Sequence, residues 1–341
     1  MHRDSIDDLR KLFVGLDKKV NINGKGRIVP INFDNAATTP PFKRVVKRVL
    51  ETTEYYGSIA RGDGQKSQYC SDLYEECRRY ILKYFNAPEE IYTAIFVGNT
   101  TDGLNKLSNI LINNKDDIVI TTRMEHHSND LPWRNKCDLK YVEVNEDGRI
   151  NINEIKELIE RYKEKVKYIT ITGASNVTGY INDIRKISGL IHKYGGKIIV
   201  DGAQLVPHKK IYMYKKDSLE NIDFLVFSGH KIYAPFGSGA IIGLRKDFNN
   251  NLPDTKGGGT VEYVIDNNQL WLNTPEKNEA GTPNLFGAVA IMEAMKEIEK
   301  IGFERIEKNE KELLQYLING LKELNRVKLY ADNDCIEDRL G

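Results

Sequence analysis

Short apolar runs alternate along this 341-residue chain with stretches of helical periodicity. Strands are expected at 28–33, 94–97, 118–121, 140–144, 168–172, 197–200, 222–227, 240–244 and 327–330. Helices are expected at 5–16, 42–56, 66–85, 152–164, 182–193, 285–300 and 303–325, with another that ends near 111. Such alternation is typical of a mostly parallel sheet with helices on both faces. The sequence therefore predicts an α/β fold.

Composition excludes several classes of protein. The net charge of +1 gives no electrostatic reason to bind nucleic acid or an acidic membrane. Cys70, Cys77, Cys137 and Cys335 form neither a CxxC pair nor a regular spacing, so we expect reduced thiols rather than disulfides or a metal site. The charged N-terminus is unlike a signal peptide, and no apolar run is long enough to cross a membrane. We expect a cytoplasmic protein.

Chemically distinctive residues follow five of the expected strands. They are Thr100 and Thr101, His126 and His127, Asn176, Asp201 and Gln204, and Ser228, His230 and Lys231. In open α/β sheets, ligands bind beyond the carboxyl ends of the strands. If these strand ends lie together, they assemble a single pocket.

Two of these residues carry charge at the end of a buried strand. Lys231 follows the apolar run 222–227, and burial there would lower its pKa and make it a nucleophile able to form a Schiff base with a carbonyl cofactor. For a lysine taken alone, a position in a surface loop is the commoner explanation. Asp201 follows Ile198-Ile199-Val200 and needs a cationic partner if it is buried, for which a protonated pyridine nitrogen would serve. The alternative for Asp201 is the N-cap of the following helix.

The remaining strand-end residues suit an aromatic phosphate ester. Thr100 and Thr101 stand where a strand turns into a helix, and a helix N-terminus binds phosphate, although capping alone is as good an explanation. His126 could stack on an aromatic ring or lie in the core, and no third ligand supports a metal site at His126 and His127. Together with the lysine and the acid, these features describe a pyridoxal phosphate site. A nucleotide site is disfavoured, because neither GxGxxG nor GxxxxGK[ST] occurs.

Eight motifs in order along the chain resemble one enzyme family. They are Asp34-Asn35-Ala36-Ala37-Thr38, Thr100-Thr101-Asp102-Gly103, Met124-Glu125-His126-His127-Ser128-Asn129, Ser175-Asn176-Val177-Thr178-Gly179, Val200-Asp201-Gly202-Ala203-Gln204, Phe227-Ser228-Gly229-His230-Lys231, Gly257-Gly258-Gly259 and Ala280-Gly281-Thr282-Pro283-Asn284. The series resembles the cysteine desulfurase and selenocysteine lyase branch of the class V aminotransferases. The resemblance implies a fold-type I enzyme with pyridoxal phosphate as cofactor and a homodimer with its sites at the subunit interface.

The resemblance also implies a role for each matching residue. Lys231 would be the Schiff-base lysine and proton shuttle. Around the cofactor ring, His126 would stack on its face, Asp201 would face the pyridine nitrogen and Gln204 the phenolic oxygen. The phosphate would be bound by Thr100, Thr101, Ser228 and His230, with Thr282 reaching over from the partner subunit, and the substrate would contact Ala36 and Asn176. The implied reaction converts L-cysteine to L-alanine and transfers sulfur, with a protein as a possible acceptor. Another class V reaction (transamination, lyase or epimerase chemistry) is the alternative.

The sequence departs from the family at two places. Desulfurases of this branch usually carry His where the early loop has Ala60 before Arg61-Gly62. The family's nucleophilic cysteine and carboxylate-binding arginine belong to a C-terminal region beyond this sequence, and Cys335 lies in an ordinary loop. We expect an N-terminal arm at 1–28, a large cofactor-binding domain at 29–284 and an incomplete small α/β domain at 285–341. A catalytically incomplete cofactor-binding subunit is therefore a further alternative.

Overall fold

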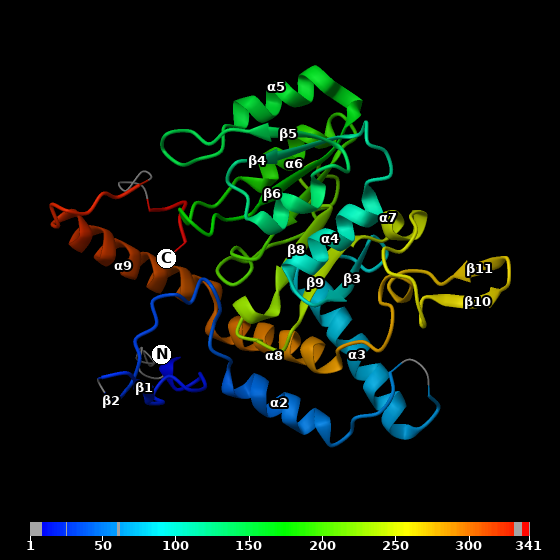
Figure 1. Ribbon diagram of the computed structural model, residues 1–341, viewed down its shortest axis with the longest axis horizontal. Coiled ribbons are helices and arrows are strands. Elements are labelled where there is room, and N and C mark those ends of the chain that lie inside the picture. The colour runs from blue at the N-terminus through cyan, green and yellow to red at the C-terminus, as the bar shows by residue number, and fades with distance from the viewer. Residues whose placement is uncertain (1–8, 25, 60–61, 331–335, 341) are drawn as a thin grey trace.

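The computed structural model describes residues 9–24, 26–59, 62–330 and 336–340 (Figure 1). Seven strands form one sheet in the order β3-β9-β8-β7-β6-β4-β5. Their bounds are β3 Tyr92–Val97, β4 Ile118–Thr122, β5 Asp138–Val142, β6 Val166–Thr172, β7 Lys197–Asp201, β8 Phe224–Ser228 and β9 Gly239–Leu244. Strands β4 to β8 pair in parallel, whereas β9 is antiparallel to both β3 and β8. The structure confirms the predicted α/β fold.

Helices cover both faces of the sheet. They are α2 Lys43–Thr53, α3 Gln65–Tyr84, α4 Thr100–Leu111, α5 Ile152–Tyr162, α6 Ile184–His192, α7 Arg245–Asn250, α8 Leu285–Ile301 and α9 Phe303–Lys322. Alternate side chains of β8 enter different cores: Leu225 and Phe227 join a cluster with residues of α5, α6 and α8, and Phe224 and Val226 join one with residues of α4. Because a central strand is buried on both faces, its sequence is a continuous apolar run.

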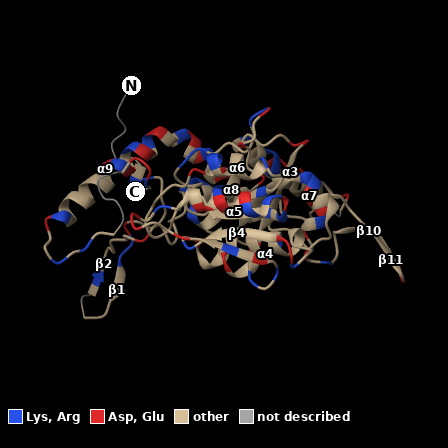
Figure 2. Ribbon diagram, turned by 90° about the horizontal axis from the view of Figure 1, so that it is seen from above, with Lys and Arg blue, Asp and Glu red and all other residues tan. Residues whose placement is uncertain are grey.

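Helix α3 packs against α8 through a third apolar cluster. Cys70, Leu73 and Cys77 of α3 meet Val289 and Met292 of α8, and all five side chains are buried. Cys70 and Cys77 therefore share one helix face. None of the described helices combines the length and the apolar character needed to span a membrane. Lysines and arginines alternate with acids along the outer helices (Figure 2), as the net charge near zero suggests.

Two predicted strands are wrong. Of 28–33, only Ile28 lies in a strand, because β2 (Gly26–Ile28) pairs with β1 (Val20–Ile22) and ends there. Residues 327–330 have no strand conformation. Both segments have strand-like composition, but among the described residues neither 29–33 nor 327–330 has a neighbouring strand to supply backbone hydrogen bonds, and a strand needs such a neighbour.

The N-terminal helix prediction is also wrong where it can be checked. Of 5–16, residues 5–8 lie outside the described residues, only Leu9 and Arg10 are helical, and Phe13 instead forms a β-bridge with Phe42. Gly15 has a φ of 83°, which an α-helix does not allow.

A hairpin and a short helix were not predicted. Strands β10 (Val261–Ile265) and β11 (Asn268–Trp271) form a hairpin that projects away from the sheet (Figure 1), and α7 follows β9 directly. The hairpin is largely exposed on both faces, so its sequence lacks the alternation that marks a half-buried strand. The predicted domain division at 28 and 284 stays a prediction.

Candidate functional site

A cavity of about 650 Å³ opens at the carboxyl end of the parallel strands. Strand pairing brings these ends together, because Thr172 lies opposite Asp201 in the β6–β7 ladder and Ser228 lies opposite Gly239 in the β8–β9 ladder. Among the residues that line the cavity are Ala36, Thr100, Thr101, His126, Asn176, Asp201, Gln204, Ser228, His230 and Lys231. The expectation that the strand ends assemble one pocket is thus confirmed, while the role of each residue stays a prediction.

Asp201 and Lys231 carry opposite charge within this cavity. Asp201 ends β7 with 3% of its surface exposed, and its Oδ1 accepts the Ala203 N–H at 2.9 Å. Burial raises the pKa of Asp201, and the Ala203 hydrogen bond and the charge of Lys231 oppose that rise. Burial likewise lowers the pKa of Lys231, against the charges of Asp201 and Asp34. Each group is therefore held closer to its neutral form than it would be in water.

Helix α4 points its N-terminus at the cavity. The N-cap is Asn99, whose Oδ1 accepts the Asp102 N–H at 2.9 Å, so the expected capping role of the two threonines is wrong. The Thr100 N–H instead donates to Ser228 Oγ at 2.8 Å, which ties the helix to β8. Within the described part of the chain, the Thr101 N–H has no acceptor. This free amide at a positive helix end suits an anionic group.

A glycine allows the close approach of α4 to the sheet. A Cβ placed on Gly239 would lie 2.5 Å from Phe227 O and 3.1 Å from the Asn99 Cα. Any side chain at this position would therefore push the helix N-terminus away from β8 and β9. The residue type at 239 thus helps to shape the cavity end that α4 forms.

The orientation of His126 is set by Ser128. His126 Nδ1 accepts the Ser128 N–H at 3.1 Å, so the proton of the neutral ring lies on Nε2. The Ser128 hydroxyl lies 2.9 Å from the same nitrogen and 2.7 Å from Thr101 Oγ1. Ser128 was not predicted as a site residue, although it falls within the strand-end motif. Its hydrogen bonds connect the ring at His126 to the start of α4.

A half-buried acid, Glu125, directly precedes His126 in the chain. Glu125 accepts hydrogen bonds from Thr122 Oγ1 at 2.7 Å and from Asn129 Nδ2 at 2.6 Å. Burial raises the pKa of Glu125 to about 8, against the effect of these hydrogen bonds and with a smaller rise from Asp201. Glu125 was also not predicted as a site residue. It links the end of β4 to η1 (His127–Asn129), the turn that follows His126.

Hydrogen bonds with Gln204 and His230 hold the 34–39 segment against the cavity. Gln204 Nε2 donates to Ala36 O at 2.9 Å. The His230 carbonyl accepts the Thr39 N–H at 3.0 Å, and His230 Nδ1 lies 3.1 Å from Thr38 Oγ1. Burial and the charge of Lys231 lower the pKa of His230. These contacts form the wall of the cavity that carries Ala36.

A smaller cavity continues from the first. It measures about 260 Å³ and shares Ala36, Asn176, Gln204 and Lys231 with the larger one. The shared residues include both predicted substrate contacts, Ala36 and Asn176. The two cavities together offer room for a cofactor and a small second molecule beside Lys231.

Comparison with known proteins identifies the family. Residues 31–339 match the family model described as aminotransferase class-V. The chain belongs to this family. A probable cysteine desulfurase of Borreliella burgdorferi is 36% identical over 346 residues, an alignment that covers 97% of this chain and 79% of the relative. A cysteine desulfurase of Wigglesworthia glossinidia brevipalpis is 33% identical over 338 residues, covering 96% of this chain and 79% of the relative.

Solved structures agree with the sequence relatives. The apo cysteine desulfurase of Thermococcus onnurineus NA1 has a TM-score of 0.82 and 31% identity, covering 90% of this chain and 76% of that structure. The cysteine desulfurase CsdA of Escherichia coli has a TM-score of 0.72 and 26% identity, covering 85% of this chain and 72% of that structure. These matches confirm the resemblance and the fold type. The chain is a cysteine desulfurase-like class V enzyme, and membership of the family implies pyridoxal phosphate as cofactor.

Some predicted residues of this class V enzyme lie away from the cavity or outside the described residues. Thr282 lines an adjoining cavity of about 280 Å³ and does not line the larger one. Cys335, Ala60 and Arg61 lie outside the described residues. Within the described chain there is no group of three or more side chains arranged to hold a metal ion.

Proposed function

We propose that this chain binds pyridoxal phosphate in the larger cavity and removes sulfur from L-cysteine to leave L-alanine. The observation that carries the proposal is the presence of Lys231 and Asp201 on one cavity wall, each shifted toward its neutral form by burial. The proposal agrees with the cysteine desulfurases found among the relatives.

The residues present fit the cofactor. Asp201 has an incompletely satisfied carboxylate that would bind a protonated ring nitrogen, because a cation restores the charged form that burial disfavours. The free Thr101 N–H, the α4 N-terminus and the hydroxyl of Ser228 would receive the phosphate, with Thr100 and His230 beside them. His126 would lie against the ring, Gln204 would face its phenolic oxygen, and Lys231 Nζ would hold its aldehyde carbon.

The chain's own residues would supply binding and proton transfer. When bound, the cofactor withdraws the electrons that remain on the substrate α-carbon after its proton leaves. Lys231, with a pKa lowered by burial, would take this proton at Nζ and return it later in the reaction. Asp201 would keep the ring nitrogen protonated, and Asn176 and Ala36 would place the substrate at the mouth of the smaller cavity.

The sulfur would pass to a thiol. In a balanced reaction, L-cysteine and an acceptor thiol give L-alanine and an acceptor persulfide: the carbon–sulfur bond breaks, a sulfur–sulfur bond forms, and the thiol proton goes to carbon. None of the described cysteines, Cys70, Cys77 and Cys137, lines the cavity, and burial raises the pKa of Cys77 and of Cys137, the latter to about 11. We therefore propose that the acceptor thiol comes from outside the described cavity wall, with a partner protein as one source.

We further propose a homodimer in which Thr282 of one chain reaches the phosphate of the other. In support, Thr282 does not line the larger cavity of its own chain but lies on an adjoining cavity, which shares Gly98, Gly237 and Ser238 with it. Cross-linking the purified protein and measuring its mass in solution would test the dimer.

Reconstitution with pyridoxal phosphate tests the proposed function. We expect the purified protein to gain a visible absorption band with the cofactor, and to form alanine and sulfide from L-cysteine in the presence of a small thiol. Lys231→Ala should abolish both results. Protein that stays colourless, or that is unchanged by the substitution, would refute cofactor binding. Cofactor binding without alanine formation would favour another class V reaction.

A further inference from the structure

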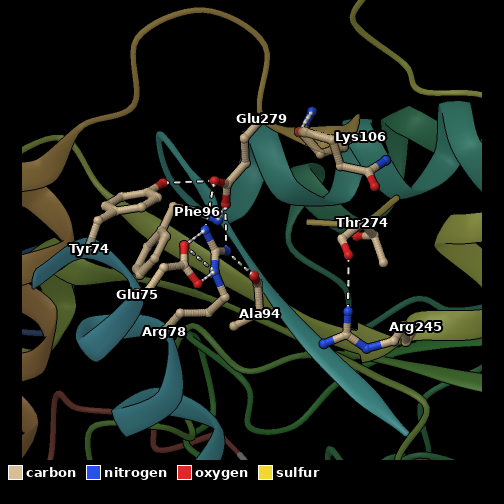
Figure 3. A network of polar contacts seen from close by, with 10 residues as sticks. Tyr74, Glu75, Arg78, Ala94, Phe96, Lys106, Arg245, Thr274 and Glu279 are labelled. Carbon is tan, nitrogen blue, oxygen red and sulfur yellow. Dashed lines mark hydrogen bonds and ion pairs between the residues drawn. The ribbon is translucent and has the colours of Figure 1, made fainter. Parts of the chain in front are cut away.

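A buried ion pair joins α3 to the loop that precedes α8 (Figure 3). Arg78 Nη1 and Nη2 donate to Oε1 and Oε2 of Glu279 at 2.9 and 3.0 Å. Only 6% of the Arg78 side chain and 9% of the Glu279 side chain are exposed. The Tyr74 hydroxyl adds a further hydrogen bond to Glu279 at 2.9 Å. Two parallel hydrogen bonds between a guanidinium and a carboxylate fix their relative orientation, so Glu279 has little freedom to move.

The pair also completes the hydrogen bonds at the open edge of the sheet. Strand β3 is an edge strand, and its Phe96 N–H donates to Glu279 Oε1 at 2.7 Å. Two residues earlier, Ala94 O accepts a hydrogen bond from Arg78 Nη1. The ion pair thus supplies the acceptor and the donor that a neighbouring strand would provide. It fixes β3 just before the chain enters 98–101, which forms one wall of the cavity.

In the other direction along the chain, Glu279 leads to a second wall. Five residues later, Asn284 Nδ2 donates to Phe236 O at 3.0 Å and to Gly237 O at 3.1 Å. Gly237 and Ser238 line the larger cavity. The ion pair is therefore connected by short segments to both sides of the cavity end where α4 begins.

We propose that Arg78 and Glu279 are positioning residues that hold these two walls at the separation the cofactor phosphate requires. Neither residue lines the cavity, so they act through Phe96 and Asn284. This inference rests on the proposed function, since it concerns the same site. The ring end of the cavity is carried by Asp201 and Lys231, which end β7 and follow β8 in the middle of the sheet and make no contact with the ion pair.

The placement of the pair makes its effect specific to phosphate. Glu279→Gln keeps the size of the side chain but turns an amide N–H₂ toward the donors of Arg78, Tyr74 and Phe96. Movement of β3 or of the Asn284 loop would displace the free amide of Thr101 before it displaced Lys231. We therefore expect affinity for a phosphorylated ligand to fall and affinity for the same ring without phosphate to stay.

Equilibrium binding of two probes to the apo protein tests the inference. The dissociation constants of pyridoxal phosphate and of pyridoxal are measured for the wild type, Glu279→Gln and Arg78→Lys, each shown to be folded by thermal melting. We expect Glu279→Gln to raise the constant for pyridoxal phosphate at least tenfold and that for pyridoxal less than twofold. Arg78→Lys keeps the charge but loses the double hydrogen bond. It should therefore also raise the ratio of the pyridoxal phosphate constant to the pyridoxal constant, but by less than Glu279→Gln does. If Glu279→Gln does not fold, Arg78→Lys decides the question.

Asp223→Asn is the matched control. Asp223 is also a buried carboxylate that accepts a strand amide, from Ile198 at 2.8 Å, and binds a basic side chain, His192 at 2.7 Å. It precedes β8 and so lies at the opposite end of the sheet from the cavity. The Asp223→Asn substitution should lower the melting temperature and leave the ratio of the two dissociation constants unchanged.

Two outcomes would overturn the positioning role: equal changes of both constants in the Arg78 and Glu279 variants, or no change in either. A wild type that binds neither probe would refute the proposed function instead.

Discussion

Two sets of oppositely charged residues, Arg78 with Glu279 and Lys231 with Asp201, differ in how far protein groups satisfy them. Glu279 receives hydrogen bonds from Arg78, Tyr74 and the Phe96 amide, and Arg78 has its pKa raised because the charge of Glu279 outweighs burial. Asp201 accepts one backbone amide, and Lys231 has its pKa lowered by burial.

This difference in hydrogen bonding distinguishes a pair that stabilises the fold from a pair that can still bind a ligand. A buried pair with every polar atom satisfied fixes backbone position and offers nothing to a ligand. A pair that faces a cavity with unused hydrogen-bonding capacity gains from a ligand that supplies the missing partners. The first pair supports the site from the sheet edge, and the second belongs to the site itself.

Replacing Lys231 should produce the largest effect. Lys231→Ala removes the group proposed to move the α-proton, and we expect alanine formation from L-cysteine to fall by at least about 10²–10⁴-fold. The melting temperature of the apo protein should change little, because the half-buried Lys231 side chain forms no ion pair with another described residue that the substitution would break. Lys167→Ala, on the exposed start of β6, is the control and should keep full activity. A large loss of stability in Lys231→Ala would contradict the comparison.

Replacing Arg78 should show the opposite behaviour. Arg78→Met leaves Glu279 buried and unpaired, and we expect the free energy of unfolding to fall by about 3–5 kcal/mol. The double variant Arg78→Met with Glu279→Leu should recover only part of this loss: no buried charge is left unpaired, but the Phe96 N–H and Ala94 O lose their partners. Urea denaturation of the three proteins measures the effect. If Arg78→Met alone is as stable as the wild type, the pair of Arg78 and Glu279 is not a structural anchor.

A third pair predicts a smaller, pH-dependent effect. Burial lowers the pKa of His192, but the hydrogen bond and charge of Asp223 outweigh it and leave the pKa above the usual value for histidine, about 6.5. The contribution of this pair to the stability of the fold is therefore complete below about pH 6.5, and it is lost as the pH rises through the raised pKa of His192. Melting temperatures across this range should fall with pH more steeply in the wild type than in His192→Gln. Parallel curves would show that His192 does not carry this dependence.

The smallest predicted effect compares two helix caps. Asn99 and Asn151 cap α4 and α5 through hydrogen bonds to the Asp102 and Glu154 amides at 2.9 and 3.2 Å. Replacing either by Ala should cost about 1 kcal/mol of unfolding free energy. Only Asn99→Ala should also weaken pyridoxal phosphate binding, because only α4 faces the cavity. Equal binding by the two variants would argue against α4 as the phosphate-binding helix.

The sequence was most informative where local pattern and global position agree. The run 222–227 is apolar throughout because β8 is buried on both faces, and the polar residues after it must lie at the sheet edge where ligands bind. The same reasoning placed Asp201 and His126 correctly beside Lys231 in one cavity. It failed for 28–33 and 327–330, whose strand-like composition finds no neighbouring strand.

The anchor at the sheet edge could not be predicted from local sequence. Arg78 and Glu279 are 201 positions apart, and neither stands in a pattern that distinguishes it from a solvated surface charge. Glu125 and Ser128 stood in a visible motif, yet their contacts to Asn129, Thr101 and His126 depend on how the turn after β4 folds.

The sequence by itself therefore determined the fold class, the order of the strands along the chain and the residues at their carboxyl ends. Periodicity and strand-end chemistry are local properties, and they survive in the sequence of a single chain. Only the tertiary structure decided which charges are satisfied and which face the cavity. That outcome depends on packing between segments far apart in the chain, so the partners of Arg78 cannot be predicted from its neighbours in the sequence, whereas the strand-end position of Lys231 can.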